Sequence, residues 1–373
     1  MKIAVLRETA PAEYRVAATP ETVRKLMALG ASVAVESGAG VAAGIADDDY
    51  RTAGAVVASA NEVAASADMV LAVQPPPLAA LAGANKGARV LAVFDPLRER
   101  DRVQQYAASG LEGWAMDLMP RITRAQSMDV LSSQANLAGY KSVLVAANAF
   151  GRALPMMMTA AGTITAARVF VMGVGVAGLQ AIATARRLGA QVSATDVRAA
   201  TREQIMSLGA KPIFVENVAG IEGEGSGGYA TEMSPEYQAA QAELVSAHLA
   251  KQDIVITTAQ IPGRAAPRLI SDAQLATMRA GSVVVDLAAE TGGNVEGALA
   301  GESVERHGVT LIGARNMAAT LASDASALYA RNLHNLLAAF WDKERAEVTL
   351  DDEIGSAIRL TQGGAVVNER LAG

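Results

Sequence analysis

Short apolar runs alternate in the first part of the chain with segments of helical amphipathic spacing. Residues 2–6 form the first run, and Thr19 then precedes Pro20, a pair of residue types that commonly begins a helix. We expect this helix to end at Gly30. Parallel strands need a crossover connection, usually a helix, so the alternation predicts a doubly wound parallel sheet. Its strands are expected at residues 2–6, 32–36, 69–73, 89–94 and 113–116, with shorter helices at 47–53 and 102–109.

The same alternation resumes at Arg168 and continues through the second half of the chain. The tail, residues 342–373, is expected to return to the first sheet. The whole pattern predicts an α/β protein with two doubly wound, Rossmann-like parallel sheets, the first of which has no glycine fingerprint. In the second sheet, strands are expected at residues 169–172, 191–195, 212–215, 253–258, 282–287 and 309–312, and helices at 179–188, 202–208 and 235–251.

Two long helices are expected to link the two domains, one at residues 135–150 and one at 324–341. The first domain would then comprise residues 1–134 together with 325–373, and the second would comprise 135–324. Ligands of open α/β sheets bind outside the carboxyl ends of the strands, so we expect a cleft between the domains.

Two segments of unusual composition lie outside the expected strands. Met156–Met158 is a triple methionine, and because methionine fills irregular gaps in cores we expect these side chains to be buried. Residues 219–233 are rich in glycine and acidic residues and include Tyr229. This composition predicts a mobile loop, which is either a functional loop or a disordered excursion.

A glycine fingerprint joins the first strand and helix of the second domain. Gly173, Gly175 and Gly178 match G-x-G-x-x-G, whose glycines permit a tight turn, the approach of a pyrophosphate and close helix packing. Asp196 ends the next strand and is placed to accept hydrogen bonds from an adenosine ribose. Its charge favours NAD over a 2′-phosphate, although Arg198 could pair with one. The competing interpretation is a glycine-bearing turn in an unrelated α/β domain.

Further candidates for cofactor binding follow from their position at strand ends. The carboxyl ends of parallel strands meet at one edge of a sheet, so residues after the second-domain strands should share the cofactor edge. Asp286 also lies on this edge. The expected cofactor-binding residues are Gly173, Gly175, Val176, Ala177, Gly178, Asp196, Val197, Arg198, Tyr229, Thr258, Ala259, Glu290 and Asn316.

Composition excludes several classes of function. The chain has 373 residues, a net charge of −6 and no cysteine. Without a basic run there is no reason to expect nucleic-acid binding, and disulfide or thiol chemistry is excluded. The first apolar run is too short for a signal peptide. The longest uncharged run near the middle of the chain, residues 169–185, falls short of the roughly 20 apolar residues of a membrane span. We expect a soluble protein.

The expected cleft lacks an obvious proton-transfer group. Dehydrogenation of an alcohol or amine usually needs a histidine, a lysine or a similar base. The three histidines, His248, His307 and His334, do not follow first-domain strands, whereas Gln74 and Asp95 do. No nucleophile elbow and no metal-ligand spacing is present. Hydride transfer between two nicotinamides needs no base, so this reaction agrees with the absence of a histidine or lysine from the expected cleft.

A polar segment lies between the two series of strands. Residues 120–136 contain Arg121, Gln126, Asp129 and Ser132. Polar residues this dense suggest either an ordinary solvated connector or a loop that lines a cleft, and the pattern alone favours the connector.

The sequence resembles a known family over essentially its whole length. The motifs that carry the resemblance are Arg15-Val-Ala, the segment 120–134, Pro155-Met-Met-Met-Thr-Ala-Ala-Gly-Thr, the fingerprint 173–181, Thr195-Asp-Val-Arg-Ala-Ala-Thr and Gly228-Tyr-Ala-Thr-Glu-Met. They resemble the NAD(H)-binding component, domain I, of proton-translocating NAD(P) transhydrogenase, whose fold is shared with alanine dehydrogenase.

This resemblance implies a function for the polar segment. In the family it holds the nicotinamide and faces the partner, so Arg121, Gln126, Asp129 and Ser132 become the expected catalytic residues, and Tyr229 matches a loop that closes over nucleotide. The resemblance further implies an NADP(H)-binding partner subunit whose NADP⁺ accepts hydride from NADH. It also implies a membrane-spanning component that moves protons, and a homodimer on the cytoplasmic face of the inner membrane.

The likeness to alanine dehydrogenase is more distant and lacks two catalytic groups. Gln74 aligns with that enzyme's lysine and Asp95 lies near its histidine, which argues against amino-acid oxidation. Arg15 and Glu290 are then cleft relics or nicotinamide-side contacts. An amino-acid dehydrogenase of this type remains the main alternative, and a non-catalytic nucleotide-sensing module is a third.

Overall fold

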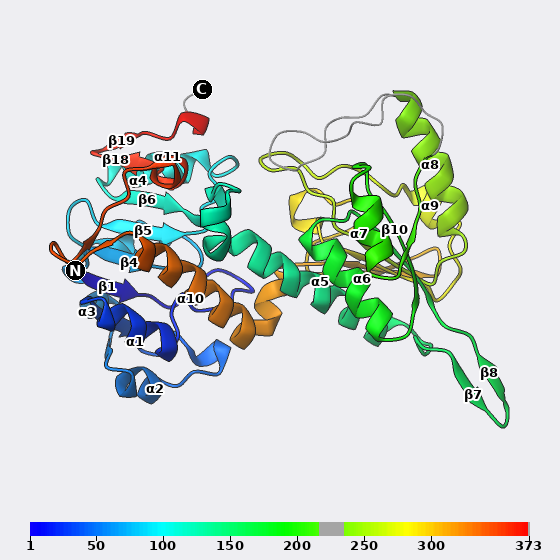
Figure 1. The fold of residues 1–373 in the computed structure, drawn as a ribbon, viewed down its shortest axis with the longest axis horizontal. Coiled ribbons are helices and arrows are strands. Elements are labelled where there is room, and N and C mark those ends of the chain that lie inside the picture. Colours follow the sequence, from blue (N-terminus) through cyan, green and yellow to red (C-terminus); the bar gives the residue numbers. More distant parts are fainter. Residues whose placement is uncertain (216–234, 372–373) are drawn as a thin grey trace. The chain divides into compact units, whose positions relative to one another are not determined.

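The structure, a computed structural model, describes residues 1–215 and 235–371. The chain divides into two compact units. Unit 1 comprises Met1–Gln134 and Ala318–Gly373, and unit 2 comprises Ala135–Met317. Figure 1 shows a twisted sheet with helices on both faces in each unit.

Unit 1 contains a parallel sheet of six strands in the order β3-β2-β1-β4-β5-β6. The order reverses between β1 and β4, as in a doubly wound fold, which confirms the predicted class. Its strands are β1 (Lys2–Val5), β2 (Ser32–Glu36), β3 (Val56–Ala58), β4 (Met69–Leu71), β5 (Arg89–Ala92) and β6 (Glu112–Ala115).

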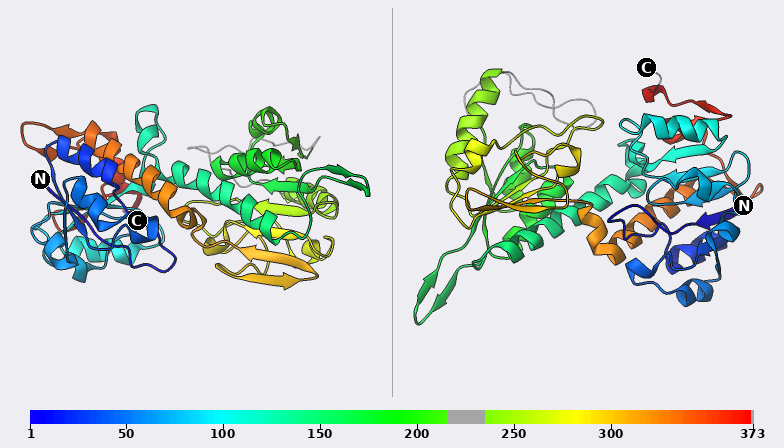
Figure 2. Two further views of the ribbon diagram at one scale, coloured as in Figure 1. Left: turned by 90° about the horizontal axis from the view of Figure 1, so that it is seen from below. Right: turned by 180° about the vertical axis from the view of Figure 1, so that it is seen from behind.

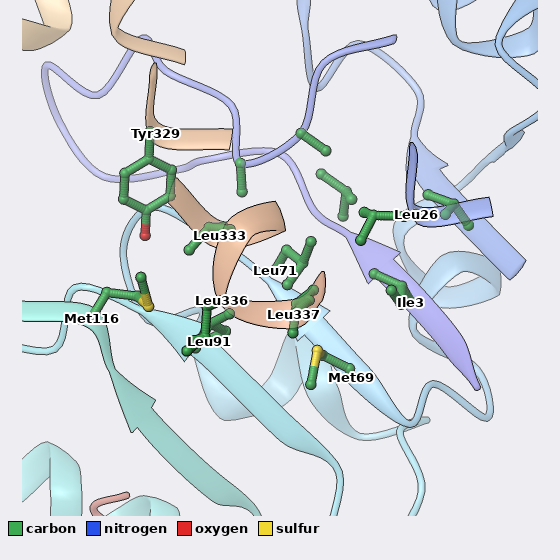
Figure 3. Packing of buried hydrophobic residues seen from close by; sticks show 14 of the residues in the cluster. Ile3, Leu26, Met69, Leu71, Leu91, Met116, Tyr329, Leu333, Leu336 and Leu337 are labelled. Atoms are coloured by element: carbon green, nitrogen blue, oxygen red, sulfur yellow. The ribbon is translucent and has the colours of Figure 1, made fainter. Parts of the chain in front are cut away.

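Side chains of β1 alternate between two buried clusters, as the pleat of a strand requires. Ile3 and Val5 belong to one cluster with α1 and α10, and Ala4 belongs to the other with α3 and α4. Figure 3 shows Leu333 and Leu336 of α10 among apolar side chains of the strands. The helices of unit 1 are α1 (Pro20–Ala28), α2 (Asp47–Thr52), α3 (Ala60–Ala64), α4 (Arg100–Ala108), α10 (Ala322–Ala339) and α11 (Glu353–Ile358), with 3-10 turns at Val41–Ala43, Leu78–Leu81, Met116–Leu118, Thr123–Met128, Met317–Leu321 and Glu369–Leu371.

The C-terminal tail covers the β6 edge of this sheet. The hydroxyl of Thr361 accepts from the Gly113 amide at 2.8 Å and donates to the Leu111 carbonyl at 2.8 Å. The amide of Leu360 donates to the Gly113 carbonyl. An edge strand exposes unpaired backbone groups, and these bonds satisfy some of that row. The tail forms β16 (Trp341–Asp342), β17 (Glu347–Val348), β18 (Thr361–Gln362) and β19 (Ala365–Val366).

Unit 2 contains a sheet of seven strands in the order β11-β10-β9-β12-β13-β15-β14. Six are parallel, and β14 runs antiparallel to β15. The strand β14 was not predicted from the sequence, because it is short and half-exposed. It reaches β15 through His307 and Gly308, both with positive φ. The strands are β9 (Arg168–Met172), β10 (Gln191–Thr195), β11 (Lys211–Pro212), β12 (Ile254–Thr257), β13 (Val283–Asp286), β14 (Ser303–Arg306) and β15 (Val309–Gly313).

Helices cover both faces of the second sheet. Val169 and Val171 of β9 pack with α5 and α6, whereas Phe170 and Met172 pack with α8 and α9. The helices are α6 (Val176–Arg187), α7 (Thr201–Ser207), α8 (Pro235–Leu249), α9 (Asp272–Leu275) and the larger part of α5 (Val130–Ala149), of which residues 130–134 belong to unit 1, with a 3-10 turn at Ala289–Thr291. Among the described residues, no helix has the length and apolar character that a membrane crossing requires.

A two-stranded hairpin projects from unit 2 (Figures 1 and 2), formed by β7 (Met157–Thr159) and β8 (Gly162–Ile164). The expectation that the triple methionine fills a core was wrong, because the side chains of Met156 and Met158 are 62% and 79% exposed. The apolar run reads like a core segment, but both of its strands face solvent.

Candidate functional site

The turn between β9 and α6 has a geometry that only glycine permits at its first position. Gly173 has φ of +96°, a region that side chains rarely adopt. A Cβ atom at this residue would also lie 2.7 Å from the hydroxyl oxygen of Thr258. That hydroxyl donates a hydrogen bond to the carbonyl of Gly173 at 2.9 Å. The predicted cofactor-binding residue Thr258 therefore lies directly against the glycine turn.

The other two glycines of the turn have different surroundings. A Cβ atom at Gly178 would lie 1.9 Å from the carbonyl oxygen of Gly173, so α6 packs on the turn at a distance that only glycine allows. At Gly175, in contrast, no heavy atom lies within 4 Å of an added Cβ. Gly175 is the N-cap of α6, and the amides of Val176 and Ala177 begin the helix. Open space at a helix N-terminus fits a pyrophosphate.

Asp196 ends β10 beside this turn and is a buried acceptor. It accepts hydrogen bonds from the amide of Val174 at 2.7 Å and from the amide and Nε of Arg198 at 2.9 Å each. Burial alone would raise the pKa of Asp196, but the hydrogen bonds from Arg198 and Val174 hold it below its usual value. The carboxylate is therefore ionised at neutral pH, and the half-buried Val197 lies between the paired residues.

Asn294 holds the loop that follows β12, and the sequence analysis missed it. Its side chain is fully buried and donates to the carbonyls of Ala259 and Pro267, both at 2.8 Å. Its Oδ1 accepts from the amide of Ala259 at 3.0 Å. The carboxamide thus pairs with both backbone groups of Ala259. The only signal in the sequence was an asparagine after two glycines beyond a strand.

Asp286 was placed on the cofactor edge by its position, but its side chain is turned inward. The carboxylate is fully buried and accepts from the amides of Ala288 and Val295 at 2.9 and 3.0 Å and from the Thr257 hydroxyl at 3.1 Å. Burial outweighs these hydrogen bonds and raises the pKa of Asp286 above its usual value. Asp286 therefore fixes the loop after β13.

Two more predicted residues meet at the carboxyl edge of the unit 2 sheet. The amide of Asn316, which follows β15, donates to the Glu290 carboxylate at 2.8 Å. Asn316 has φ of +41°, a conformation that asparagine tolerates better than most residues. Glu290 thus stabilises a turn of this loop. Tyr229 lies outside the described residues.

In unit 1, the polar segment is an ordered 3-10 turn over Thr123–Met128. Ala125 and Met128 are buried in the core, whereas Gln126 between them is exposed, as is Arg121 before the turn. The turn therefore presents the Gln126 side chain to solvent from a backbone anchored on both sides.

Asp129 and Ser132 lie together where α5 begins. The Asp129 carboxylate accepts from the Ser132 amide at 2.9 Å and from its hydroxyl at 2.5 Å. This is the arrangement of an N-cap, and it explains why α5 begins at Val130 rather than at the predicted residue 135. Both residues therefore have a local structural role, whatever else they contact.

A second polar cluster lies after the first strands of unit 1 and consists of Glu8, Glu13, Arg15, Gln74 and Gln134. The buried guanidinium of Arg15 donates to Glu13 through Nε at 2.7 Å and Nη2 at 2.6 Å, and to Gln134 at 2.9 Å. Gln74 Nε2 lies 3.5 Å from the Glu13 carboxylate. The charge of Arg15 is thus already paired within the unit.

Glu8 is the titratable group of this cluster that the sequence analysis missed. It accepts from the amides of Val73 and Gln74 at 2.6 and 3.2 Å. Burial nevertheless raises its pKa to about 7. Asp95, which also follows a first-domain strand, is not part of this cluster. Its amide donates to the Asp117 carboxylate at 2.9 Å, and its backbone has φ of +46°. The cluster contains acids, amides and an arginine, but no lysine or histidine.

The two histidines of unit 2, His248 and His307, contact other side chains of the same unit. His248 Nε2 lies 2.8 Å from the Ser193 hydroxyl, and the ring packs edge-on against Phe170. Burial lowers the pKa of His248 to about 4, so the ring is neutral at physiological pH. His307 pairs with Asp272 at 2.9 Å.

Comparison with known proteins finds matches to protein families over nearly the whole chain. The alanine dehydrogenase/PNT N-terminal domain family matches residues 4–138, and the C-terminal domain family matches residues 142–369. An NAD(P) transhydrogenase alpha subunit chain of Rhodospirillum rubrum is 50% identical over 100% of this chain and 99% of its own length.

Two solved structures extend the comparison. A transhydrogenase structure from Sinorhizobium meliloti has a TM-score of 0.90 and 52% identity, covering 98% of this chain and 100% of its own. An L-alanine dehydrogenase structure has a TM-score of 0.81 at 25% identity, covering 100% and 98%.

Proposed function

The chain belongs to the alanine dehydrogenase/PNT family and is related over its whole length to transhydrogenase alpha subunits, and from that premise we propose that it is the NAD(H)-binding subunit of a proton-translocating transhydrogenase. In this proposal NADH binds to unit 2, and hydride passes directly to NADP⁺ on a partner subunit. A membrane-spanning component couples the transfer to proton movement.

The observation that supports nucleotide binding most strongly is the glycine turn of unit 2. It combines open space at Gly175, amides at the start of α6 and the ionised carboxylate of Asp196. A pyrophosphate would lie over the helix N-terminus, and the ribose hydroxyls would donate to Asp196. Ala259 and Thr258 would line the same edge, held by Asn294 and Gly173.

The residues of unit 1 are proposed to orient rather than to exchange protons. A bound nicotinamide supplies the hydride. The exposed amide of Gln126 and guanidinium of Arg121 can hold a carboxamide or ribose by hydrogen bonds. Asp129 and Ser132 cap the start of α5, which follows the Gln126 turn directly in the chain. Because hydride transfer between nicotinamides releases no proton at the reacting carbons, no general base is required.

The partners follow from the same proposal. In this proposal the chain works with an NADP(H)-binding component and a membrane-spanning component, and it forms a homodimer on the cytoplasmic side of the inner membrane. The names of the relatives, as alpha subunits, support an assembly with other subunits.

A single assay tests the proposal. The protein is mixed with NADH and the purified NADP(H)-binding component, and reduction of an NADP⁺ analogue is followed spectroscopically. Rapid reduction that requires both proteins is expected. If the analogue is not reduced while NADH still binds, the transhydrogenase proposal is wrong and a nucleotide-sensing module is favoured.

The second candidate is an amino-acid dehydrogenase of the alanine dehydrogenase type. Glu8 favours it, because a carboxyl with a pKa near 7 is the kind of group that serves as a base. Both of its oxygens, however, accept backbone amides, and Arg15 is paired with Glu13. NADH formation from NAD⁺ and L-alanine by this chain alone would establish this alternative.

A further inference from the structure

Two asparagines of α10 bind the backbone of the turn that carries Gln126. The Nδ2 of Asn332 donates to the carbonyl of Ser127 at 2.8 Å, and the Nδ2 of Asn335 donates to the same oxygen at 3.0 Å. Residues three apart on a helix lie on one face, which is why one carbonyl can accept from both. Ser127 directly follows Gln126, and all of these residues belong to unit 1.

The orientation of the Asn332 carboxamide is determined by the Ser127 carbonyl, because that oxygen can only accept and the Nδ2 must therefore face it. The Oδ1 of Asn332 then accepts from the hydroxyl of Ser133 at 2.8 Å. The reversed carboxamide would place two acceptor oxygens together. Asn332 is buried, which makes an unpaired orientation costly. The Asn332 donor aimed at the Ser127 carbonyl therefore has one orientation in the folded chain.

The rest of the turn is anchored independently. Ala125 and Met128 are buried, and Arg124 forms an ion pair with Asp352. These contacts hold the two ends of the turn. The asparagines act between them, on the Ser127–Met128 peptide unit, one residue beyond Gln126. They restrict the backbone from which the Gln126 side chain projects, in addition to the contacts that hold the ends of the turn.

We propose that Asn332 and Asn335 are positioning residues for hydride transfer, which act on Gln126 through the carbonyl of Ser127. The proposal rests on the proposed transhydrogenase function, in which Gln126 orients the nicotinamide. Small misplacements of an orienting group reduce rate strongly while changing binding little. The helix α10 thus contributes to the reaction without contacting the cofactor through these two side chains.

The test uses Asn335→Asp, because this residue is less buried than Asn332 and the change keeps its shape. The new carboxylate would oppose the Ser127 carbonyl instead of donating to it. With the NADP(H)-binding component present, we expect kcat to fall about tenfold with an unchanged Kd for NADH. Asn61→Asp, an exposed residue of α3, makes the same change of charge and should leave both quantities unchanged.

A double-mutant cycle distinguishes positioning from a general structural role. If Asn335 acts through Gln126, then Asn335→Asp should have little further effect on kcat in a Gln126→Ala background. Hydrogen exchange of the amides of residues 123–129 in the isolated chain provides a readout without activity, and Asn335→Asp should accelerate it. Equal losses of kcat in both backgrounds, or unchanged exchange, would overturn the proposal.

Failure of this inference can be separated from failure of the function. An inactive unmodified protein with its partner would refute the transhydrogenase function itself. An active protein that Gln126→Ala slows but Asn335→Asp does not would leave the function intact and remove only the role of α10.

Discussion

At the scale of single residues, the Asp196 carboxylate already accepts hydrogen bonds from two residues, so a ligand would have to use its remaining acceptor capacity. Its carboxylate holds the amide of Val174 in the glycine turn and the guanidinium of Arg198. Such a buried and ionised acceptor is already oriented toward the turn. In the proposed function, the ribose hydroxyls would meet a carboxylate that the fold already holds in place.

Replacement of this carboxylate should weaken nucleotide binding. Asp196→Ala should reduce NADH affinity by about 1–3 kcal/mol, roughly 5- to 150-fold in Kd, because a hydrogen bond to a charged acceptor is lost. Asp196→Asn, which keeps one acceptor oxygen, should lie between. Calorimetric titration measures both, with the exposed Asp48→Asn as control. An unchanged Kd would show that the ribose is held elsewhere.

Glu8 makes a prediction about pH. Its pKa of about 7 in the folded protein lies above its ordinary value of 4.5. Between these values the folded protein retains a proton that the unfolded chain has lost, so this contribution to stability is complete below pH 4.5 and lost as the pH rises through 7.

The variant Glu8→Gln should remove this pH dependence. Urea unfolding from pH 5 to 8 should show the free energy of unfolding of the unmodified protein falling by about 1 kcal/mol relative to Glu8→Gln, a value discounted because the side chain is partly exposed. Any pH-independent effect of the lost amide contact cancels in this difference. Parallel curves for the two proteins would contradict the raised pKa.

Local spacing explains which site residues could be predicted. The three glycines and Asp196 stand in a short pattern that is local to one strand-turn-helix-strand unit, β9 to β10. Asn294 and Glu8 could not be found this way, because their partners Ala259 and Val73 are 35 and 65 residues away in the chain. Only the folded sheet brings these pairs together. The roles of the predicted residues in binding and catalysis stay predictions.

At the scale of elements, the start of α6 contains two glycines, of which one has space for a side chain and the other does not. Gly178 has no space for a methyl group, because the Gly173 carbonyl oxygen occupies it, whereas Gly175 has open space and φ of −80°. One glycine therefore serves helix packing, and the other leaves room for a ligand.

Alanine substitutions should separate these two roles. Gly178→Ala should lower the free energy of unfolding by roughly 1–3 kcal/mol through overpacking, and NADH binding should fall with it. Gly175→Ala should leave stability unchanged or raise it by about 0.4–1 kcal/mol, yet weaken NADH binding. Thermal unfolding and NADH titration are compared for both variants. Unimpaired binding by Gly175→Ala would mean that no pyrophosphate approaches this residue.

Elements were predicted well where an apolar run was long and bounded by turn residues, as for β9, β10 and α6. The start of α5 was misplaced because the polar residues of its first turn resemble a loop until Asp129 is recognised as a cap. The triple methionine was misread because apolar composition does not distinguish a core strand from an exposed hairpin. Burial depends on what the rest of the fold covers.

At the scale of the whole molecule, the sequence indicated two doubly wound sheets, and the strand orders confirm this class. It did not reveal the hairpin β7–β8. An isolated two-stranded hairpin is at best marginally stable in water. This hairpin has exposed apolar side chains at Met156, Met158 and Ile164 and no charged residue between Pro155 and Ala167. Both properties suit a segment that is covered in an assembly.

The proposed homodimer can therefore be tested through this hairpin. Met156→Glu with Met158→Glu should shift the protein toward monomer, because burial of two carboxylates in an apolar interface is unfavourable. Sedimentation velocity over a range of concentrations measures the shift, and the Kd for NADH should stay unchanged. Val56→Glu, at a 64% exposed position on the edge strand β3, is the matched control and should not alter the oligomeric state. If the double variant sediments like the unmodified dimer, other surfaces form the homodimer. If the unmodified protein is already monomeric, the homodimer itself is refuted.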